Sequence, residues 1–189
     1  MFIRSERLFL RPGWPEDWEE TLALINDESV VRNLATAPWP YTADDARAFI
    51  ARPRERLLPH FFITLPSGEG PKLIGSIGFG RDGDDVELGY WIARAHWGQG
   101  YASEAVRAVL NLARAIGHRR IVASHFTDNV ASRRVLEKAG FRAVGTRLRH
   151  GAGRGGEAPA IVHALLLGAP LTTGDDGGDG DGAAAMRAA

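Results

Sequence analysis

Apolar residues recur at helical spacing in four segments of the chain. Residues 14–26 place apolar side chains three or four positions apart, and a second helix begins at Thr42, with an acidic residue three positions later as in a capping box. Residues 102–116 carry the clearest apolar face and are followed by glycine, which commonly terminates helices. Residues 129–139 form the last predicted helix.

Seven segments have the length and apolar content of β-strands. They are residues 7–11, 60–65, 72–80, 86–93, 120–124, 141–149 and 158–167. Short turns join the strands between residues 60 and 93, which predicts an antiparallel meander. One helix lies between two later strands, which predicts a crossover. We therefore expect an α+β fold with a mixed, mostly antiparallel twisted sheet of about seven strands flanked by helices.

The carboxyl-terminal segment differs in composition from the rest of the chain. Residues 169–189 are mostly glycine, aspartate and alanine and have little apolar surface to bury, so we expect a disordered tail. Residues 1–168 have the length of one domain with a single core. Four aspartates against Arg187 give the tail a net charge of −3, which leaves +3 on the domain because the whole chain is neutral.

Composition excludes several kinds of chemistry and of partner. The chain has no cysteine, which excludes disulfides, thiolate–metal sites and a cysteine nucleophile. A charge of +3 on the domain is far below the basic surface typical of nucleic-acid binders. No segment approaches the ~20 apolar residues of a membrane helix, and residues 2–7 lack the apolar run of a secretory signal. We therefore expect a cytoplasmic protein with no nucleic-acid partner, no membrane and no metal.

Two glycines lie one residue apart just before the helix predicted for residues 102–116. Gly98 and Gly100 let the backbone turn tightly at the helix start, where unpaired N–H groups and the helix dipole favour an anion. No Gly-Lys-Ser/Thr follows, so the segment is not a P-loop, and its context is not that of a dinucleotide-binding fold. Spacing alone leaves a generic phosphate or nucleotide site open.

Four blocks of the sequence resemble one family. Residues 87–92 followed by 97–105 look like the acetyl-CoA motif of the GNAT superfamily, and residues 129–141 resemble its next block. Residues 6–12 and 39–42 are similar to the Rim-type branch, which acetylates the amino termini of ribosomal proteins. The resemblance implies a GNAT fold and an N-acetyltransferase that uses acetyl-CoA.

The resemblance also implies which residues hold acetyl-CoA. Main-chain amides of the glycine loop would bind its pyrophosphate, the edge of the preceding strand would pair with its pantetheine amides, and an asparagine would complete the site. These residues are Gly98, Gln99, Gly100, Tyr101, Ala102 and Ser103, then Trp91, Ile92 and Ala93, and then Asn129. The sequence departs from the family pattern at Trp97, where the family carries arginine or glutamine.

Acetyl transfer to an amine requires a free lone pair on nitrogen. At pH 7 about 0.04% of a lysine-like amine of pKa about 10.4 is neutral, against roughly a tenth of an α-amino group of pKa about 7.8, so a general base assists. Alternation along its strand places Glu87 on the opposite face from its apolar neighbours. Glu87 is therefore our candidate base, acting through water. His125 and His60, each at the end of a predicted strand, are the alternatives.

The thiolate that leaves needs a hydrogen-bond or proton donor. Many members of the family carry a tyrosine seven residues after the asparagine for this purpose, but that position is Leu136 here. Ser132, three residues after Asn129, is the neighbouring hydroxyl, and we expect it to take the role. The alternative is a first-turn residue that satisfies the backbone.

A proline-broken loop carries two aromatic residues. Trp39 and Tyr41 flank Pro40, and by family resemblance they would line the acceptor pocket. The acceptor is a primary amine, either a protein N-terminus or a small molecule. The alternative function is a CoA-binding sensor or interaction module with weak catalysis, because the tyrosine is missing. A homodimer is compatible with the branch that the sequence resembles.

Overall fold

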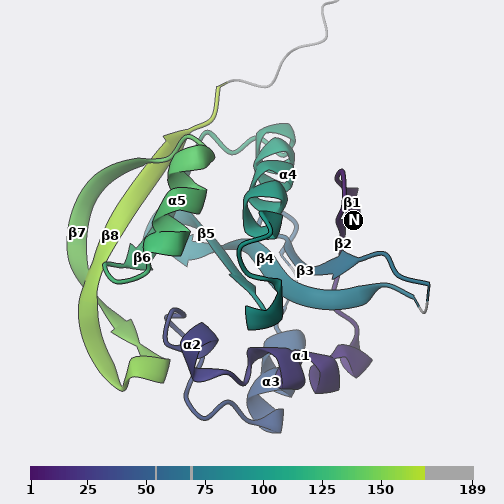
Figure 1. The fold of residues 1–189 in the computed structure, drawn as a ribbon. Helices are drawn as coiled ribbons and strands as arrows, with labels where there is room; N and C mark the ends of the chain where they lie inside the picture. The colour runs from purple at the N-terminus through teal and green to yellow at the C-terminus, as the bar shows by residue number, and fades with distance from the viewer. Residues whose placement is uncertain (54, 69, 169–189) are drawn as a thin grey trace, which may run out of the picture.

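One sheet of eight strands separates two groups of helices (Figure 1). The computed structural model describes residues 1–53, 55–68 and 70–168. The helices α4 and α5 lie on one side of the sheet, and α1, α2 and α3 lie on the other. The predicted disordered tail, residues 169–189, lies outside the described residues.

The strands lie in the order β1-β2-β3-β4-β5-β6-β8-β7. Their bounds are β1 Ile3–Arg4, β2 Phe9–Arg11, β3 His60–Leu65, β4 Lys72–Asp82, β5 Asp85–Ile92, β6 Arg120–Phe126, β7 Arg142–Gly151 and β8 Gly156–Leu166. Among the strands of the described residues, only the pair β5–β6 is parallel, because α4 crosses over between the two strands. The α+β fold and the mostly antiparallel sheet are confirmed, with eight strands where about seven were predicted.

The helices α1, α3, α4 and α5 correspond to the predicted segments, although α1 begins four residues later than predicted, and α2 was not predicted. Their bounds are α1 Trp18–Ile25, α2 Glu28–Val31, α3 Ala43–Ile50, α4 Tyr101–Ala115 and α5 Val130–Lys138. Thr42 caps α3 by accepting the N–H of Asp45 at 3.2 Å, and the Asp45 carboxylate accepts the N–H of Thr42 at 2.9 Å, so the capping box is confirmed. No helix of the described residues is long and apolar enough to cross a bilayer, and these residues hold no cluster of three acidic or histidine side chains that could bind a metal.

Each face of the sheet carries its own apolar cluster. The cluster beneath α4 and α5 includes Leu88 and Val106, whereas the cluster on the side of α1–α3 includes Val31 and Trp91. Side chains alternate along a strand, so Leu88 and Trp91 of β5 point to opposite faces. By the same alternation Glu87 shares a face with Trp91, on the side of α1–α3.

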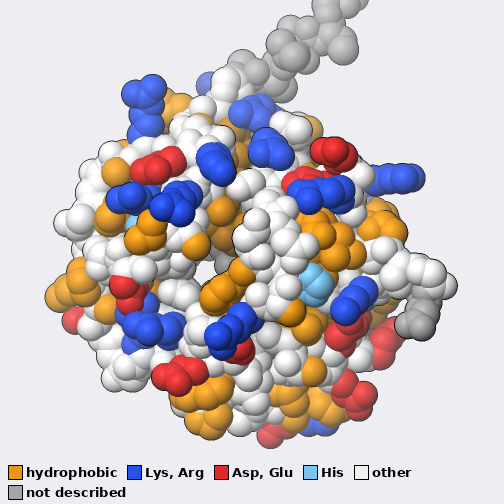
Figure 2. Space-filling view, in the orientation of Figure 1, with side chains coloured by type: hydrophobic (Ala, Val, Ile, Leu, Met, Phe, Trp, Pro, Cys, Tyr) orange, Lys and Arg blue, Asp and Glu red, His pale blue; other side chains and the backbone are white. Residues whose placement is uncertain are grey.

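The two parallel strands separate soon after they meet. Glu87 and Val122 form the single registered pair of β5 with β6, whereas β5 stays paired with β4 as far as Ile92. The end of β5 that leads toward the glycine loop therefore borders a gap in the sheet. In the space-filling view the surface is hollowed at the centre of this face, between α5 and the segment that leads into α4 (Figure 2).

Candidate active site

The glycine loop leaves the start of α4 open. Gly98 and Gly100 have φ angles of 74° and 81°, a left-handed conformation that glycine adopts without steric cost. Gly100 is the N-cap of α4 and supplies no side chain, and the first helical bond runs from the Glu104 N–H to the Gly100 carbonyl at 3.1 Å. The N–H groups of residues 101–103 thus have no partner within the helix and, with the helix dipole, form a site suited to an anion.

The amino-terminal segment fixes this loop through a buried carboxylate. Glu104 accepts the Ser5 hydroxyl at 2.7 Å, and from Arg7 it accepts the main-chain N–H at 2.7 Å and Nε at 2.8 Å. Arg7 also donates from Nη1 to the Gln99 carbonyl at 3.1 Å, and its guanidinium lies 4.7 Å above the Tyr101 ring. Burial alone would raise the pKa of Glu104, but the bonds from Arg7 and Ser5 outweigh it and hold that pKa below its ordinary value. Residues 6–12 carry part of the family resemblance, but the sequence indicated no role for Arg7.

Trp97, which departs from the family pattern, ties the loop to the end of β5. Its indole Nε1 donates to the Ile92 carbonyl at 2.7 Å, while the ring remains 45% exposed. The side chain therefore fixes the angle between strand and loop, a local structural role that needs no contact with a ligand.

The main-chain groups of β5 point alternately toward β4 and toward the gap. Ala93 donates its N–H to the Ile74 carbonyl of the β4 side at 2.8 Å, so its main chain is directed away from the gap. Alternation directs Trp91 the same way and turns the main chain of Tyr90 and Ile92 toward the gap. Of the predicted residues Trp91, Ile92 and Ala93, Ile92 directs its main chain toward the gap, and so does Tyr90, which the sequence did not indicate.

Glu87 is bound by an arginine from the far edge of the sheet. Arg149 Nη2 donates to Glu87 Oε2 at 2.7 Å, Arg149 Nη1 contacts Oε1, and the Ser124 hydroxyl donates to Oε1 at 2.8 Å. The side chains of Arg149 and Glu87 are 23% and 15% exposed. The hydrogen bond to Glu87 raises the pKa of Arg149. Glu87 lies on the face of β5 opposite Leu88, as alternation predicted, and there its carboxylate is engaged by an arginine and a serine.

This ion pair requires the β7–β8 hairpin to curl over the sheet. Neighbouring strands lie about 4.8 Å apart, so in a flat sheet β7 would be roughly 14 Å from β5, beyond the reach of an arginine. The hairpin tip docks on the loop after α2, where the Ala152 N–H donates to the Ala35 carbonyl at 3.0 Å. Figure 1 shows both strands curving toward α2. A Cβ on Gly153 would lie 2.5 Å from Val31 Cγ1, so glycine permits this contact.

The two histidines proposed as alternative bases both make contacts within the protein. His125 is buried on the opposite face of β6 from Ser124, with Nδ1 2.8 Å from the Phe126 carbonyl and Nε2 3.1 Å from Nε2 of His163. Burial, and then the neighbouring His125, lower the pKa of His163. The ring of His60 packs at the start of β3, 5.0 Å from that of Phe49. His125 is enclosed by protein, whereas His60 is exposed at the start of β3. Of the three candidates, Glu87 is the one in the pair that joins β5 to β6.

The start of α5 brings Asn129 and Ser132 to the gap. Asn129 caps α5 by accepting the Ser132 N–H on Oδ1 at 3.0 Å, and the Ser132 Oγ lies 2.7 Å from the Tyr90 hydroxyl. Ser132 is half-buried, whereas Leu136 is fully buried in the apolar cluster beneath α4 and α5. The family's tyrosine position is thus part of the core here.

The two aromatic residues of the proline loop separate. Trp39 is 41% exposed, whereas Tyr41 is buried in the cluster that contains Trp91. Burial, and then the charge of Asp45, raise the pKa of Tyr41 to about 12. Trp39 is therefore free to contact a ligand at the surface, and Tyr41 supports the face of the sheet from within.

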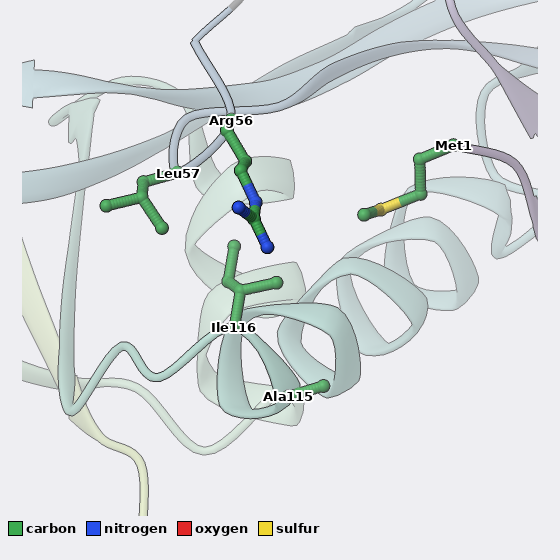
Figure 3. Close-up of a pocket in the computed structure, with 5 residues that line it drawn as sticks. All are labelled: Met1, Arg56, Leu57, Ala115 and Ile116. Carbon is green, nitrogen blue, oxygen red and sulfur yellow. The ribbon is translucent and has the colours of Figure 1, made fainter.

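One surface hollow lies away from these residues. It has a volume of about 420 Å³ and is lined by Met1, Arg56, Leu57, Ala115 and Ile116 (Figure 3). It adjoins the carboxyl-terminal end of α4, whereas the glycine loop precedes the amino-terminal end. We assign it no role in the site.

Two features define an acyltransferase of the GNAT fold. They are the gap between the parallel strands β5 and β6 and the glycine loop whose N–H groups are free at the start of α4. Residues 7–142 match the protein family described as "Acetyltransferase (GNAT) domain". A Bacillus subtilis protein named "Uncharacterized N-acetyltransferase YoaA" is 44% identical over 152 residues, which cover 76% of this chain and 84% of that protein. The chain therefore belongs to the GNAT acetyltransferase family and is an acetyl-CoA-dependent acyltransferase.

Solved structures agree with this assignment. A GNAT-family acetyltransferase from Bacillus anthracis is 29% identical and has a TM-score of 0.74, covering 88% of this chain and 98% of that one. RimL, a ribosomal alpha-N-protein acetyltransferase in complex with coenzyme A, has a TM-score of 0.71 with 19% identity and covers 88% of this chain and 98% of its own. The second likeness shows the fold alone.

Proposed function

We propose that this protein transfers acetyl from acetyl-CoA directly to a primary amine, without a covalent enzyme intermediate. The observation that carries the proposal is the uncapped start of α4 beside the gap between β5 and β6. The chain has no cysteine, so a thioester intermediate on the enzyme is excluded.

Acetyl-CoA would lie along the free edge of β5. Its pyrophosphate would accept hydrogen bonds from the main chain of Gly98, Gln99, Gly100, Tyr101, Ala102 and Ser103. Its pantetheine amides would pair with Tyr90 and Ile92, as an added strand pairs with a sheet edge. Asn129 would close the site from the start of α5. The clamp of Arg7 on Glu104 supports this arrangement because it holds the loop in place before any ligand arrives.

Glu87 would accept the proton of the amine through a water molecule. Its position beside the single pair that joins β5 to β6 supports this role, and its ion pair with Arg149 fixes the carboxylate. The amine would attack the acetyl carbonyl, and Ser132 would donate a hydrogen bond to the sulfur that leaves. We expect Glu87→Gln to lower kcat by about 10²–10⁴-fold while acetyl-CoA still binds. Glu137→Gln on the outer face of α5 is the matched control.

We propose that the acceptor carries a single amine rather than a polycation. Three carboxylates on the acceptor side are engaged by arginines. These pairs are Glu87 with Arg149, Asp128 with Arg32 and Arg154, and Asp27 with Arg94. A polyamine would have to displace these arginines, whereas a protein N-terminus or a small monoamine would not. Trp39, exposed at the surface, would contact the acceptor, and Tyr41 would support that pocket from the core.

Thiol release from acetyl-CoA tests the proposal against a panel of amino-terminal peptides, monoamines and polyamines. The absence of cysteine keeps the protein from contributing to the signal. Acceptor-dependent release with peptides or monoamines supports the transferase, and faster release with polyamines contradicts the acceptor class. A lack of acetyl-CoA binding in calorimetry contradicts the assignment of the glycine loop.

A second candidate is a CoA-binding module with weak catalysis. It is favoured by Arg149 and Ser124, which engage Glu87, and by the buried Leu136 in place of a tyrosine. Acetyl-CoA binding without thiol release across the whole panel would support this candidate. The expected homodimer is tested in the same preparations by sedimentation equilibrium.

A further inference from the structure

Two hydroxyl groups meet where β5 approaches α5. The Tyr90 hydroxyl lies 2.7 Å from Ser132 Oγ and 3.4 Å from the Ser132 carbonyl. Ser132 is held in turn by Asn129, whose Oδ1 accepts its N–H at 3.0 Å. The ring of Tyr90 packs against the apolar cluster beneath α4 and α5, so the phenol has little freedom to move. The pair is thus fixed by one strand and one helix start.

One of the two O–H groups makes the hydrogen bond between Tyr90 and Ser132, and the other O–H is left to bind a third group. Each hydroxyl brings one proton, and a single proton lies between the two oxygens. A phenol is a stronger acid than an aliphatic alcohol, so Tyr90 is the better donor and Ser132 Oγ the better acceptor. The remaining proton is then that of Ser132, and this hydroxyl is only half-buried.

We propose that Tyr90 is a positioning residue that donates to Ser132 Oγ and so directs the Ser132 O–H toward the sulfur of the thioester. The inference rests on the proposed function, because it assigns a second hydroxyl to the same reaction. Tyr90 neighbours Trp91 and Ile92 on β5, the strand edge along which pantetheine would lie. Tyr90 on β5 thus brings a phenol hydroxyl to this place, whereas Leu136 on α5, at the position of the family's tyrosine, has none.

Energetics favour hydrogen bonding over proton transfer from this pair. Burial raises the pKa of Tyr90 to about 12, against the opposing effect of the bond with Ser132. A thiol has a pKa of about 8.5, so complete transfer from the phenol to a thiolate is unfavourable by roughly 3,000-fold. The C–N bond therefore forms and the C–S bond breaks with the electron pair left on sulfur. The Ser132 O–H donates a hydrogen bond to this sulfur and so stabilises the thiolate. The proton of the amine leaves through Glu87 and water, and the thiolate takes its proton from solvent.

The pKa of the CoA thiol bound to the enzyme reports this interaction directly. Thiolate absorbance in the ultraviolet follows its titration, and CoA is the only thiol present because the protein has no cysteine. Donation from Ser132 lowers the thiol pKa in the complex. We expect Tyr90→Phe to raise that pKa by about one unit, equivalent to a tenfold change, and Ser132→Ala to raise it at least as much. The double variant should add little, because both act on one donor.

Kinetics and rescue separate positioning from packing. Tyr90→Phe should lower kcat for acetyl transfer about tenfold while the KM for acetyl-CoA changes less than twofold. Ser132→Thr keeps the hydroxyl and should restore both the thiol pKa and kcat relative to Ser132→Ala.

The outcomes distinguish this inference from the proposed function. If Ser132→Ala shifts the thiol pKa and a folded Tyr90→Phe does not, Tyr90 only packs and the inference is overturned. If neither variant shifts it although CoA binds and the wild type turns over, the proposed acetyl transfer stands, but the role proposed for Ser132 and the inference about Tyr90 both fail. If the wild-type protein does not bind CoA in calorimetry, both are overturned. Should Tyr90→Phe not fold, the comparison of Ser132→Ala with Ser132→Thr decides, because the inference requires the serine hydroxyl to lower the thiol pKa.

Discussion

The buried carboxylate of Glu104 should stabilise both the fold and the glycine loop. In Glu104→Gln the amide oxygen can replace Oε1 and keep the bonds from Ser5 and from the Arg7 main chain. The amide NH₂ then replaces Oε2 and faces the Arg7 guanidinium, which had donated to it at 2.8 Å. Loss of one hydrogen bond to a charged group costs about 1.5–3 kcal/mol. Because the Arg7 side chain is 44% exposed, we expect about 2 kcal/mol.

Urea denaturation measures this cost. With an m-value of about 2 kcal/mol/M, the midpoint of the variant at pH 7 should fall by roughly 1 M. The matched control is Asp44→Asn, which also removes a first-turn acid but one whose side chain is 95% exposed, so its effect should be below about 0.5 kcal/mol. The KM for acetyl-CoA should rise in Glu104→Gln alone, because Arg7 also holds the Gln99 carbonyl.

The stability difference between wild type and Glu104→Gln should depend on pH. The pKa of Glu104 is lower in the folded than in the unfolded protein, so its stabilisation is present above the unfolded pKa of about 4.3 and is lost as the pH falls through the folded pKa. The difference between wild type and Glu104→Gln should therefore shrink between pH 7 and pH 3.5. An equal difference at both pH values would show that the effect is packing and would refute the electrostatic reasoning.

Three further changes test other parts of the site. Gly100→Ala forces alanine into a left-handed conformation, which costs about 1–2 kcal/mol, and should raise the KM for acetyl-CoA. Gly80→Ala is the control, because a Cβ there meets open space, and it should leave that KM unchanged in the same assay. Gly153→Ala places a Cβ 2.5 Å from Val31 Cγ1, should cost about 1–3 kcal/mol in urea denaturation, and should raise the KM for the acceptor more than that for acetyl-CoA. The pKa of His163 is lowered in the folded protein, so the unfolded state binds more protons and stability should fall from pH 7 to pH 5; His163→Gln should show a smaller fall in urea titrations at the two pH values.

Features that depend on neighbouring residues could be predicted from the sequence. The Thr42 cap and the strand His60–Leu65 follow from patterns a few residues long, and the structure reproduces both. The helix that follows Gly100 was likewise predicted from local features, namely its apolar face and the glycine that precedes it. The short strand β1 and the four-residue α2 were not predicted, because two to four residues carry too little periodicity to indicate an element.

Contacts between distant segments could not be predicted. Arg149 is 62 residues from Glu87, and Tyr90 is 42 residues from Ser132. Alternation placed Glu87 on the correct face, but it carries no information about which side chain lies opposite. The main-chain direction of Ala93 depends on its bond to Ile74, which is set by the register of β4 against β5. Sequence alone therefore indicated the strand that borders the gap but not which of its amides face it.

The two halves of the site are encoded differently, and this difference bears on acceptor choice. The half proposed for acetyl-CoA comes from β5, the glycine loop and the start of α5, each a short run of consecutive residues, so a sequence motif can describe it. The half proposed for the acceptor depends on the curl of the β7–β8 hairpin, which brings Arg149 to Glu87 and Arg154 to Asp128. That curl depends in turn on the fit of Gly153 against α2 and its following loop. Family members can therefore share the first half while changes at the hairpin tip alter the second, so the acceptor has to be established from this surface and not from the motif.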